Sequence, residues 1–178
     1  MIAIDSGATA GGTYDGVTYQ ADKYSDGGEA NSTPDPIAGT TAVALYQTER
    51  YGTYSYKIPV TAGTFTIELH MAEIYNNTAG ERSFNVSVEG QQVLSSLDLY
   101  TQAGHDGAFS YTVEDVRVSD GTLDIALESL VDNATLAGFA IYSADGRLDT
   151  SRPEPSCNGY VAITYDDGPS GNTGAYVN

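Results

Sequence analysis

Alternating apolar and polar residues define the clearest element of the chain, between residues 64 and 71. One face of this stretch carries the apolar side chains of Phe65, Ile67, Leu69 and Met71. An alternation of period two is typical of a strand with one buried face. Pro59 and a turn at residues 61–63 separate it from a second, less regular strand over residues 54–58. The pattern predicts a hairpin whose outer ends are polar loops with tyrosines, at residues 46–51 and 73–77.

Short strands of the same kind are expected over most of the chain. They fall at residues 2–5, 17–21, 83–89 and 136–142, and Asp120-Gly121 is a strong hairpin-turn signal. Gly27-Gly28 indicates another turn, and no window has a helical period. About eight to ten short strands with frequent turn signals predict an all-β fold, an antiparallel β-sandwich.

The pattern changes at residue 143. Residues 143–158 have no apolar periodicity and contain two prolines, which predicts a linker. Residues 159–165 then form a continuous apolar run, of the kind found in strands buried on both faces of a parallel sheet. We therefore expect a sandwich domain over residues 1–142 and the truncated start of a second domain over residues 159–178.

Charge narrows the choice of partners. The chain has 7 basic and 24 acidic residues, a net charge of −17. Nucleic acid and membrane are not expected partners, because no basic patch is present to bind phosphates or anionic lipid. An acidic surface suits a secreted, extracellular or cell-surface protein and a monomer, with any signal segment outside this chain. Carboxylates such as Asp22 and Asp26 could bind calcium, although their spacing fits no known loop pattern.

Several ordered motifs resemble the malectin family. They are LYQTERYG at 45–52, AEIY at 72–75, SFNVSVEG at 83–90 and VDNATLAGFAIY at 131–142. The resemblance implies that residues 1–142 form a galactose-binding-like β-sandwich. It also implies that loops at one end of the sandwich bind carbohydrate, with no cofactor.

The resemblance implies specific site residues. The family's binding tyrosines fall on Tyr51 and Tyr75, its late loop aspartate on Asp132, and a further tyrosine near Tyr24, where the intervening loop is longer here. The animal member of the family has a second aromatic residue after the second tyrosine. Asn76 occupies that position here and is included in the expected site, but it removes a stacking platform that the animal member has for diglucose.

A second, shorter resemblance concerns the end of the chain. GYVAITYDDGPSGNT at 159–173 is similar to the opening motif of polysaccharide deacetylases, carbohydrate esterase family 4. This implies a C-terminal stub of an α/β deacetylase barrel. In the full-length enzyme Asp166 would be the general base and Asp167 a ligand of a zinc-type divalent metal. Such a site needs about three protein ligands, so we expect this chain alone to be inactive.

Three functions remain open. The leading one is a carbohydrate-binding module that recognises a polysaccharide or oligosaccharide and targets an appended deacetylase to it. The chain could instead be a fragment of a metal-dependent deacetylase whose activity resides in the missing domain, or a non-binding structural or interaction sandwich. Glu49 and Arg50 could be an ordinary surface pair, or Arg50 could support the site, and His70 and His105 are expected to be structural.

Overall fold

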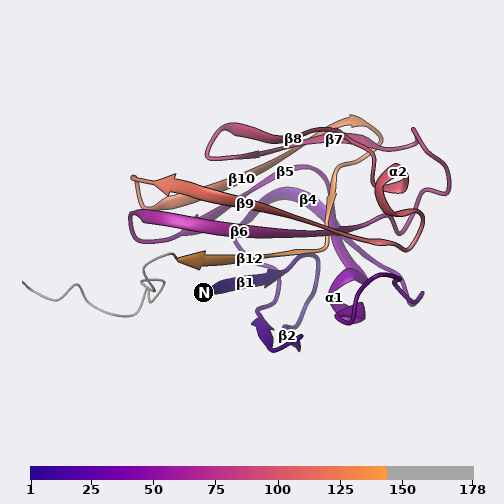
Figure 1. The fold of residues 1–178 in the computed structure, drawn as a ribbon, viewed down its shortest axis with the longest axis horizontal. Coiled ribbons are helices and arrows are strands. Elements are labelled where there is room, and N and C mark those ends of the chain that lie inside the picture. The colour runs from indigo at the N-terminus through magenta and orange to yellow at the C-terminus, as the bar shows by residue number, and fades with distance from the viewer. Residues whose placement is uncertain (144–178) are drawn as a thin grey trace, which may run out of the picture.

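The computed structural model describes residues 1–143, and within them two antiparallel sheets stack face to face (Figure 1). The first sheet has the order β1 (Ile2–Asp5), β12 (Gly138–Ser143), β6 (Gly63–Ala72) and β9 (Ala108–Val118). The second has the order β11 (Thr135–Leu136), β5 (Thr48–Pro59), β10 (Thr122–Val131), β7 (Ser83–Val88) and β8 (Gln91–Leu97). The predicted all-β, antiparallel sandwich is confirmed.

A sixth strand of the second sheet, a short hairpin and two helices complete the fold. β4 (Ser25–Ser32) pairs with β5 alone, and β2 (Gly12–Tyr14) and β3 (Val17–Tyr19) form a separate hairpin. The helices α1 (Val43–Tyr46) and α2 (Leu99–Ala103) are single turns, too short to give a helical period in the sequence. Neither helix within residues 1–143 has the length and apolar character to cross a membrane. The expected deacetylase stub, with Asp166 and Asp167, lies outside the described residues, as does all of the expected linker except Ser143.

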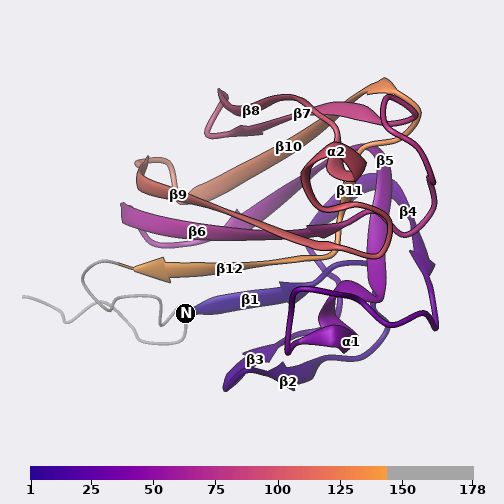
Figure 2. The ribbon, with the colours of Figure 1, turned by 45° about the vertical axis from the view of Figure 1, so that its right-hand side comes forward.

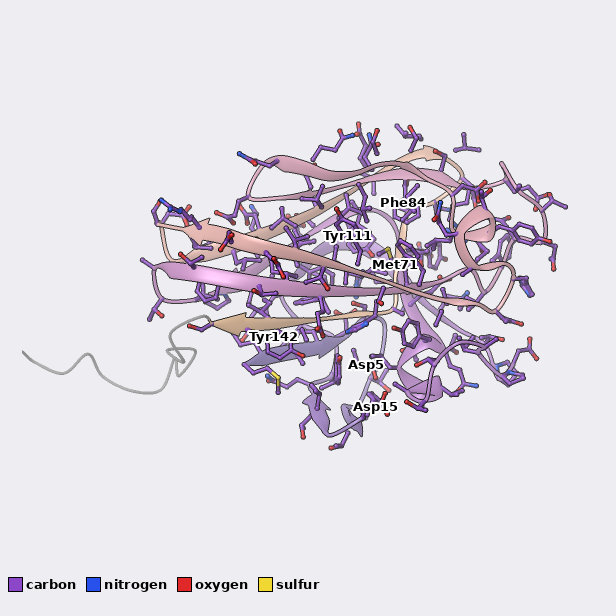
Figure 3. All side chains as sticks on the ribbon, in the orientation of Figure 1. Asp5, Asp15, Met71, Phe84, Tyr111 and Tyr142 are labelled. Atoms are coloured by element: carbon purple, nitrogen blue, oxygen red, sulfur yellow. The ribbon has the colours of Figure 1, made fainter. Side chains whose placement is uncertain are left out.

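The core lies between the sheets, and the alternation of β6 builds one side of it. Its four apolar side chains are at most 2% exposed, and they pack against residues of the other sheet such as Phe84 and Tyr56. Figure 3 shows Met71 and Phe84 in this interior. The predicted β6 strand is confirmed. The two predicted hairpins are wrong, because β5 and β6, and likewise β9 and β10, belong to different sheets, so each turn connects the sheets instead of two paired strands.

The single strand predicted over residues 136–142 is wrong, because the chain changes sheets within it. Leu136 pairs with Arg50 in the second sheet, whereas Gly138 pairs with His70 in the first. A Cβ atom on Gly138 would lie 2.8 Å from Leu45 Cδ1 and 2.9 Å from the Ile4 carbonyl oxygen. The crossing is therefore close-packed and requires glycine, which the apolar pattern alone does not reveal.

Two predicted connections also differ. Residues 46–51 do not form a loop, because β5 already begins at Thr48 and carries Tyr51 within the sheet. Gly27-Gly28 lies inside β4, where the register with β5 shifts between Gly27 and Glu29. Such a bulge lets a glycine-rich segment remain a strand. Both differences move polar residues from expected loops onto the β4–β5 ladder.

His70 is half-buried on the outer side of the first sheet, between two tyrosines. Its Nδ1 lies 3.0 Å from the Tyr46 hydroxyl and its Nε2 3.0 Å from the Tyr19 hydroxyl. Burial lowers the pKa of His70, and the nearby Glu68 charge only partly offsets this. A histidine with a lowered native pKa binds fewer protons folded than unfolded. Its contribution to stability is present above the unfolded pKa of about 6.5 and is lost as the pH falls through the native value.

We expect the free energy of unfolding to decrease below about pH 6.5, by up to about 1.4 kcal/mol per pH unit from this residue. Urea unfolding over a pH series measures the slope, and His70→Gln should flatten it. His105→Gln is the matched control, since that side chain is 32% exposed. An identical slope in wild type and His70→Gln would contradict this expectation.

Candidate functional site

One cavity of about 260 Å³ lies at the end of the sandwich where β4 ends and β5 begins. It is lined by residues of β4, β5, the β6–β7 connection and the β10–β11 bend: Asn31, Glu49, Tyr51, Tyr75, Arg82, Asp132 and Asn133. Figure 2 shows the β10–β11 bend and the connection from β6 to β7 at this same end. Three residues expected to bind sugar, Tyr51, Tyr75 and Asp132, therefore line one cavity.

The two tyrosines are held differently. Tyr51 lies on β5, opposite Thr135 of β11, and its hydroxyl donates to Glu29 Oε2 at 2.8 Å. Tyr75 is 68% exposed, and its ring has no recorded partner among the described residues. A tyrosine this exposed gains little from packing in the free protein, so its face is available to a ligand.

A buried ion pair fixes the connection that carries Tyr75. Arg82 Nε lies 2.5 Å from Glu73 Oε2, and Arg82 Nη2 lies 3.0 Å from Glu73 Oε1. Both side chains are at most 2% exposed. Glu73 Oε1 also accepts from the backbone N–H groups of Tyr75 and Asn76, at 3.0 and 2.8 Å. One carboxylate therefore sets the backbone path of both residues.

The same arginine reaches the other side of the cavity. Arg82 Nη1 donates to the Asn133 carbonyl oxygen, and Nη2 lies 4.0 Å from Asp132 Oδ2. Burial acts to lower the pKa of Arg82, but its bonds to Glu73 and the nearby carboxylates outweigh this and raise it. The arginine stays charged and ties the β6–β7 connection to the β10–β11 bend.

Asp132 is the accessible carboxylate of the cavity. It has a positive φ of 52°, in the bend between β10 and β11, and its side chain is 33% exposed. Asn76 Nδ2 donates to its Oδ2 at 3.2 Å, and Asn133 Nδ2 donates to its Oδ1 at 3.0 Å. Asn76 thus contacts the site through Asp132. Each carboxylate oxygen accepts one amide here and retains capacity for a ligand hydroxyl.

Glu49 forms a buried part of the cavity wall. It is 3% exposed, accepts from Asn31 Nδ2 at 3.0 Å through Oε1, and accepts from the Thr135 hydroxyl through Oε2. Arg50, the next residue of β5, donates instead to Asp22 and to the carbonyl oxygens of residues 27 and 28. Neighbouring strand residues face opposite sides, so Glu49 and Arg50 do not form a surface pair.

Tyr24 lies away from this cavity. It precedes β4 at the end opposite Asn31, its carbonyl oxygen accepts from the Lys57 N–H at 3.0 Å, and Lys23 Nζ lies 4.7 Å from its ring centroid. Tyr24 and Asn31 are seven positions apart along the chain, a path of roughly 20 Å in a strand. We therefore leave Tyr24 out of the site proposed below.

The structure also adds residues that sequence reasoning did not assign to the site: Asn31, Glu49, Arg82 and Asn133 line the cavity, and Glu73 supports it. Glu73 does not suit acid–base chemistry with Asp132, because it is fully buried and accepts four hydrogen bonds. Residues 1–143 contain no group of three or more His, Cys, Asp or Glu residues arranged around a metal position. The geometry suits binding of a hydroxylated ligand, with an aromatic face beside a carboxylate.

Comparison with known proteins places the chain in a family. Residues 1–148 match the Malectin domain family. The Arabidopsis thaliana kinesin-like protein KIN-14Q is 33% identical over 146 residues, which cover 79% of this chain and 11% of that protein. Malectin-B of Xenopus laevis is 32% identical over 84 residues, 46% of this chain and 30% of that protein. The chain thus spans a minor part of both relatives.

Solved structures share the fold. A Bacteroides uniformis beta-glucuronidase superposes with a TM-score of 0.71 at 22% identity, over 80% of this chain and 18% of that one. The plant receptor-like kinase FER superposes with a TM-score of 0.68 at 16% identity, over 82% of this chain and 50% of that one. At these identities the likeness concerns the fold alone. Malectin domains bind oligosaccharides in general, and the match over residues 1–148 shows that this chain belongs to the malectin domain family of carbohydrate-binding domains.

Proposed function

We propose that this domain binds a neutral oligosaccharide or polysaccharide in the cavity between Tyr51, Tyr75 and Asp132. The observation that supports it most is the placement of the exposed Tyr75 and the accessible Asp132 on two connections joined by the buried Glu73–Arg82 pair. An exposed aromatic face lowers the solubility of a protein, and burying an ion pair requires its desolvation. Both unfavourable features are expected in a site that is preorganised for a ligand.

The chemistry of the cavity matches that of a sugar. The C–H face of a pyranose packs on an aromatic ring, because the face of the ring carries negative charge. Asp132 can accept two hydroxyl groups in charge-assisted hydrogen bonds. Glu49 and Asp132 are both acidic, the buried Arg82 is already paired, and the net charge is −17. These charges disfavour anionic saccharides.

Removing the exposed ring tests this function. Tyr75→Ala should weaken saccharide binding by roughly 2- to 13-fold, the equivalent of about 0.5–1.5 kcal/mol for one aromatic contact. The urea midpoint should not change, because a side chain that is 68% exposed contributes little packing. Titration calorimetry with the best hit of a glycan array measures the affinity.

Tyr24→Ala is the matched control, since it removes an exposed tyrosine at the far end of β4. We expect its affinity to equal that of wild type. Equal affinities for wild type and Tyr75→Ala, or a weakened Tyr24→Ala, would contradict the proposed site. Absence of retention on any polysaccharide gel would favour the alternative of a non-binding structural or interaction module.

We propose further that the domain targets an appended polysaccharide deacetylase to its substrate outside the cell. This rests on the motif at residues 159–173, in which Asp166 and Asp167 would serve as general base and metal ligand. A chain extended past Asn178 should release acetate from an acetylated polysaccharide in the presence of a zinc-type metal. Metal-dependent acetate release by the 178-residue chain itself would contradict our expectation that the activity requires the missing part.

A further inference from the structure

A second and larger hollow lies beside the sugar cavity. Its volume is about 370 Å³, and it opens between the loop of residues 7–10, Tyr14 of β2, the end of β4 and Thr48 of β5. Asp5, at the end of β1, lies at its base, and Figure 3 shows Asp5 on the side of α1 and β2. Ligand clefts usually have about 300–1,000 Å³. The second hollow is within that range, whereas the sugar cavity, at about 260 Å³, is just below it.

Asn31 lines both hollows. Its side chain is exposed, and Nδ2 donates to Glu49 Oε1 on the side of the sugar cavity. The next residue, Ser32, lines only the second hollow and lies opposite Thr48 in the ladder. β4 pairs with β5 alone, so its other edge is unpaired within the described residues. A chain-like ligand can therefore pass from one hollow to the other across the β4 edge at Asn31.

Backbone groups at this edge are suited to bind hydroxyl groups. Thr33 N–H donates to the Gln47 carbonyl oxygen at 2.9 Å. This bond shows which residues of β4 direct their backbone groups toward β5. In an antiparallel ladder the backbone groups of alternate residues point toward and away from the partner strand. The N–H and C=O groups of Ala30 and Ser32 therefore point away from β5, and both residues line the second hollow.

The base of the second hollow is polar and acidic. Asp5 is 1% exposed, and its two carboxylate oxygens accept from the Thr48 hydroxyl at 2.6 Å and the Tyr14 hydroxyl at 2.9 Å. Both hydroxyl oxygens retain lone pairs toward a ligand. The carboxylate disfavours an anion, and the hydroxyl groups suit an uncharged polar molecule.

Small residues keep this hollow open. Residues 7–10 are Gly-Ala-Thr-Ala, and Ala30 and Ala44 form other parts of the wall. Gly7 has a φ of 78°, and a Cβ atom there would lie 2.1 Å from the Glu49 carbonyl oxygen. The loop thus packs against β5 with its backbone, and no large side chain from it fills the space.

We propose that one neutral glycan chain occupies both hollows, crossing the β4 edge at Asn31, so that the site recognises an oligosaccharide longer than a disaccharide. This proposal rests on the function proposed above. Sugar units beyond those held by Tyr51 and Tyr75 contact the outward backbone groups of Ala30 and Ser32 and the hydroxyl groups above Asp5.

Titration calorimetry with oligosaccharides of increasing length tests the proposal. The probes are the maltose, xylobiose and chitobiose series, each from the disaccharide to the hexasaccharide. For the series that binds, we expect wild-type affinity to rise about tenfold with chain length, the effect of one or two added net hydrogen bonds. Thr9→Trp, an exposed position on the wall of the second hollow, should abolish this rise and leave the disaccharide affinity unchanged.

Ala30→Trp blocks the same hollow from β4 and is the second variant if Thr9→Trp fails to fold. Ser110→Trp, an exposed position on β9, is the matched control and should behave as wild type. If the disaccharide binds but affinity does not increase with chain length, this inference is overturned and the proposed function remains intact. If no member of any series binds, the proposed function fails and the inference fails with it.

Discussion

Replacing Arg82 with methionine is expected to destabilise the domain by about 3–5 kcal/mol and to remove most of its saccharide affinity. Methionine keeps much of the side-chain length but leaves the fully buried Glu73 carboxylate without its counter-charge. Breaking a buried ion pair on one side has a cost of this size, because the remaining charge is uncompensated. The Asn133 carbonyl oxygen also loses its donor, so Tyr75 and Asp132 are no longer held at a fixed separation.

Urea unfolding and titration calorimetry measure the two effects. Arg117→Met on β9 is the matched control, since that arginine is exposed, and it should change stability by no more than about 0.5 kcal/mol. The double variant Glu73→Gln/Arg82→Met should be clearly more stable than the sum of the two single effects predicts, because the two residues contact each other. A loss below about 1 kcal/mol in Arg82→Met, or additive single effects, would show that the pair does not hold the site together.

The second large effect is expected at Asp22, which fastens the N-terminal segment to the second sheet. Its Oδ2 accepts from the Gly7 N–H at 2.7 Å and from Arg50 Nε at 2.8 Å, and its Oδ1 accepts from the Tyr56 hydroxyl at 2.8 Å. The Asp22 side chain is 6% exposed and that of Arg50 17%. Asp22→Ala leaves Arg50 without its carboxylate and the Gly7 N–H without its acceptor.

We expect Asp22→Ala to reduce the free energy of unfolding by about 2–3 kcal/mol, below the full cost of breaking a buried pair, because Arg50 retains contact with water and with two carbonyl oxygens. Asp26→Ala, an exposed aspartate on β4, is the matched control and should be near neutral. Urea midpoints measure both. Similar midpoints for the two variants would mean that the Asp22 bonds contribute no more than a surface carboxylate does.

Sequence alternation predicted the centre of the fold well and its edges poorly. The β6 strand has a period-two pattern and is present as expected. The predicted β5–β6 and β9–β10 hairpins are not present, because a turn signal does not show that the two strands beside it join different sheets. β4 was missed because its central glycines indicate a turn, while β5 supplies the pairing that keeps the segment extended. The change of sheets at Ala137 was missed because local patterns do not show which sheet a strand joins.

The site was predicted only in part. The positions of Tyr51, Tyr75 and Asp132 came from the family resemblance, and the structure brings them to one cavity. The Glu73–Arg82 pair was missed, because two charged residues nine positions apart in a polar connection are normally expected to be exposed to solvent. Only the tertiary fold shows that this connection covers them. Tyr24 was assigned to the site by the same resemblance, although the loop that follows the family motif is longer in this chain. The structure places Tyr24 at the other end of β4.

The most direct test of the central claim is a saccharide titration of the isotope-labelled wild-type chain, followed residue by residue by amide NMR shifts. The proposed function predicts saturable shifts at Tyr51, Tyr75, Asn76 and Asp132, all with one common dissociation constant. The amides near Tyr24, at the opposite end of β4, should not change. Saturable shifts confined to the Tyr24 end, with none at Tyr75 or Asp132, would contradict sugar binding in this cavity.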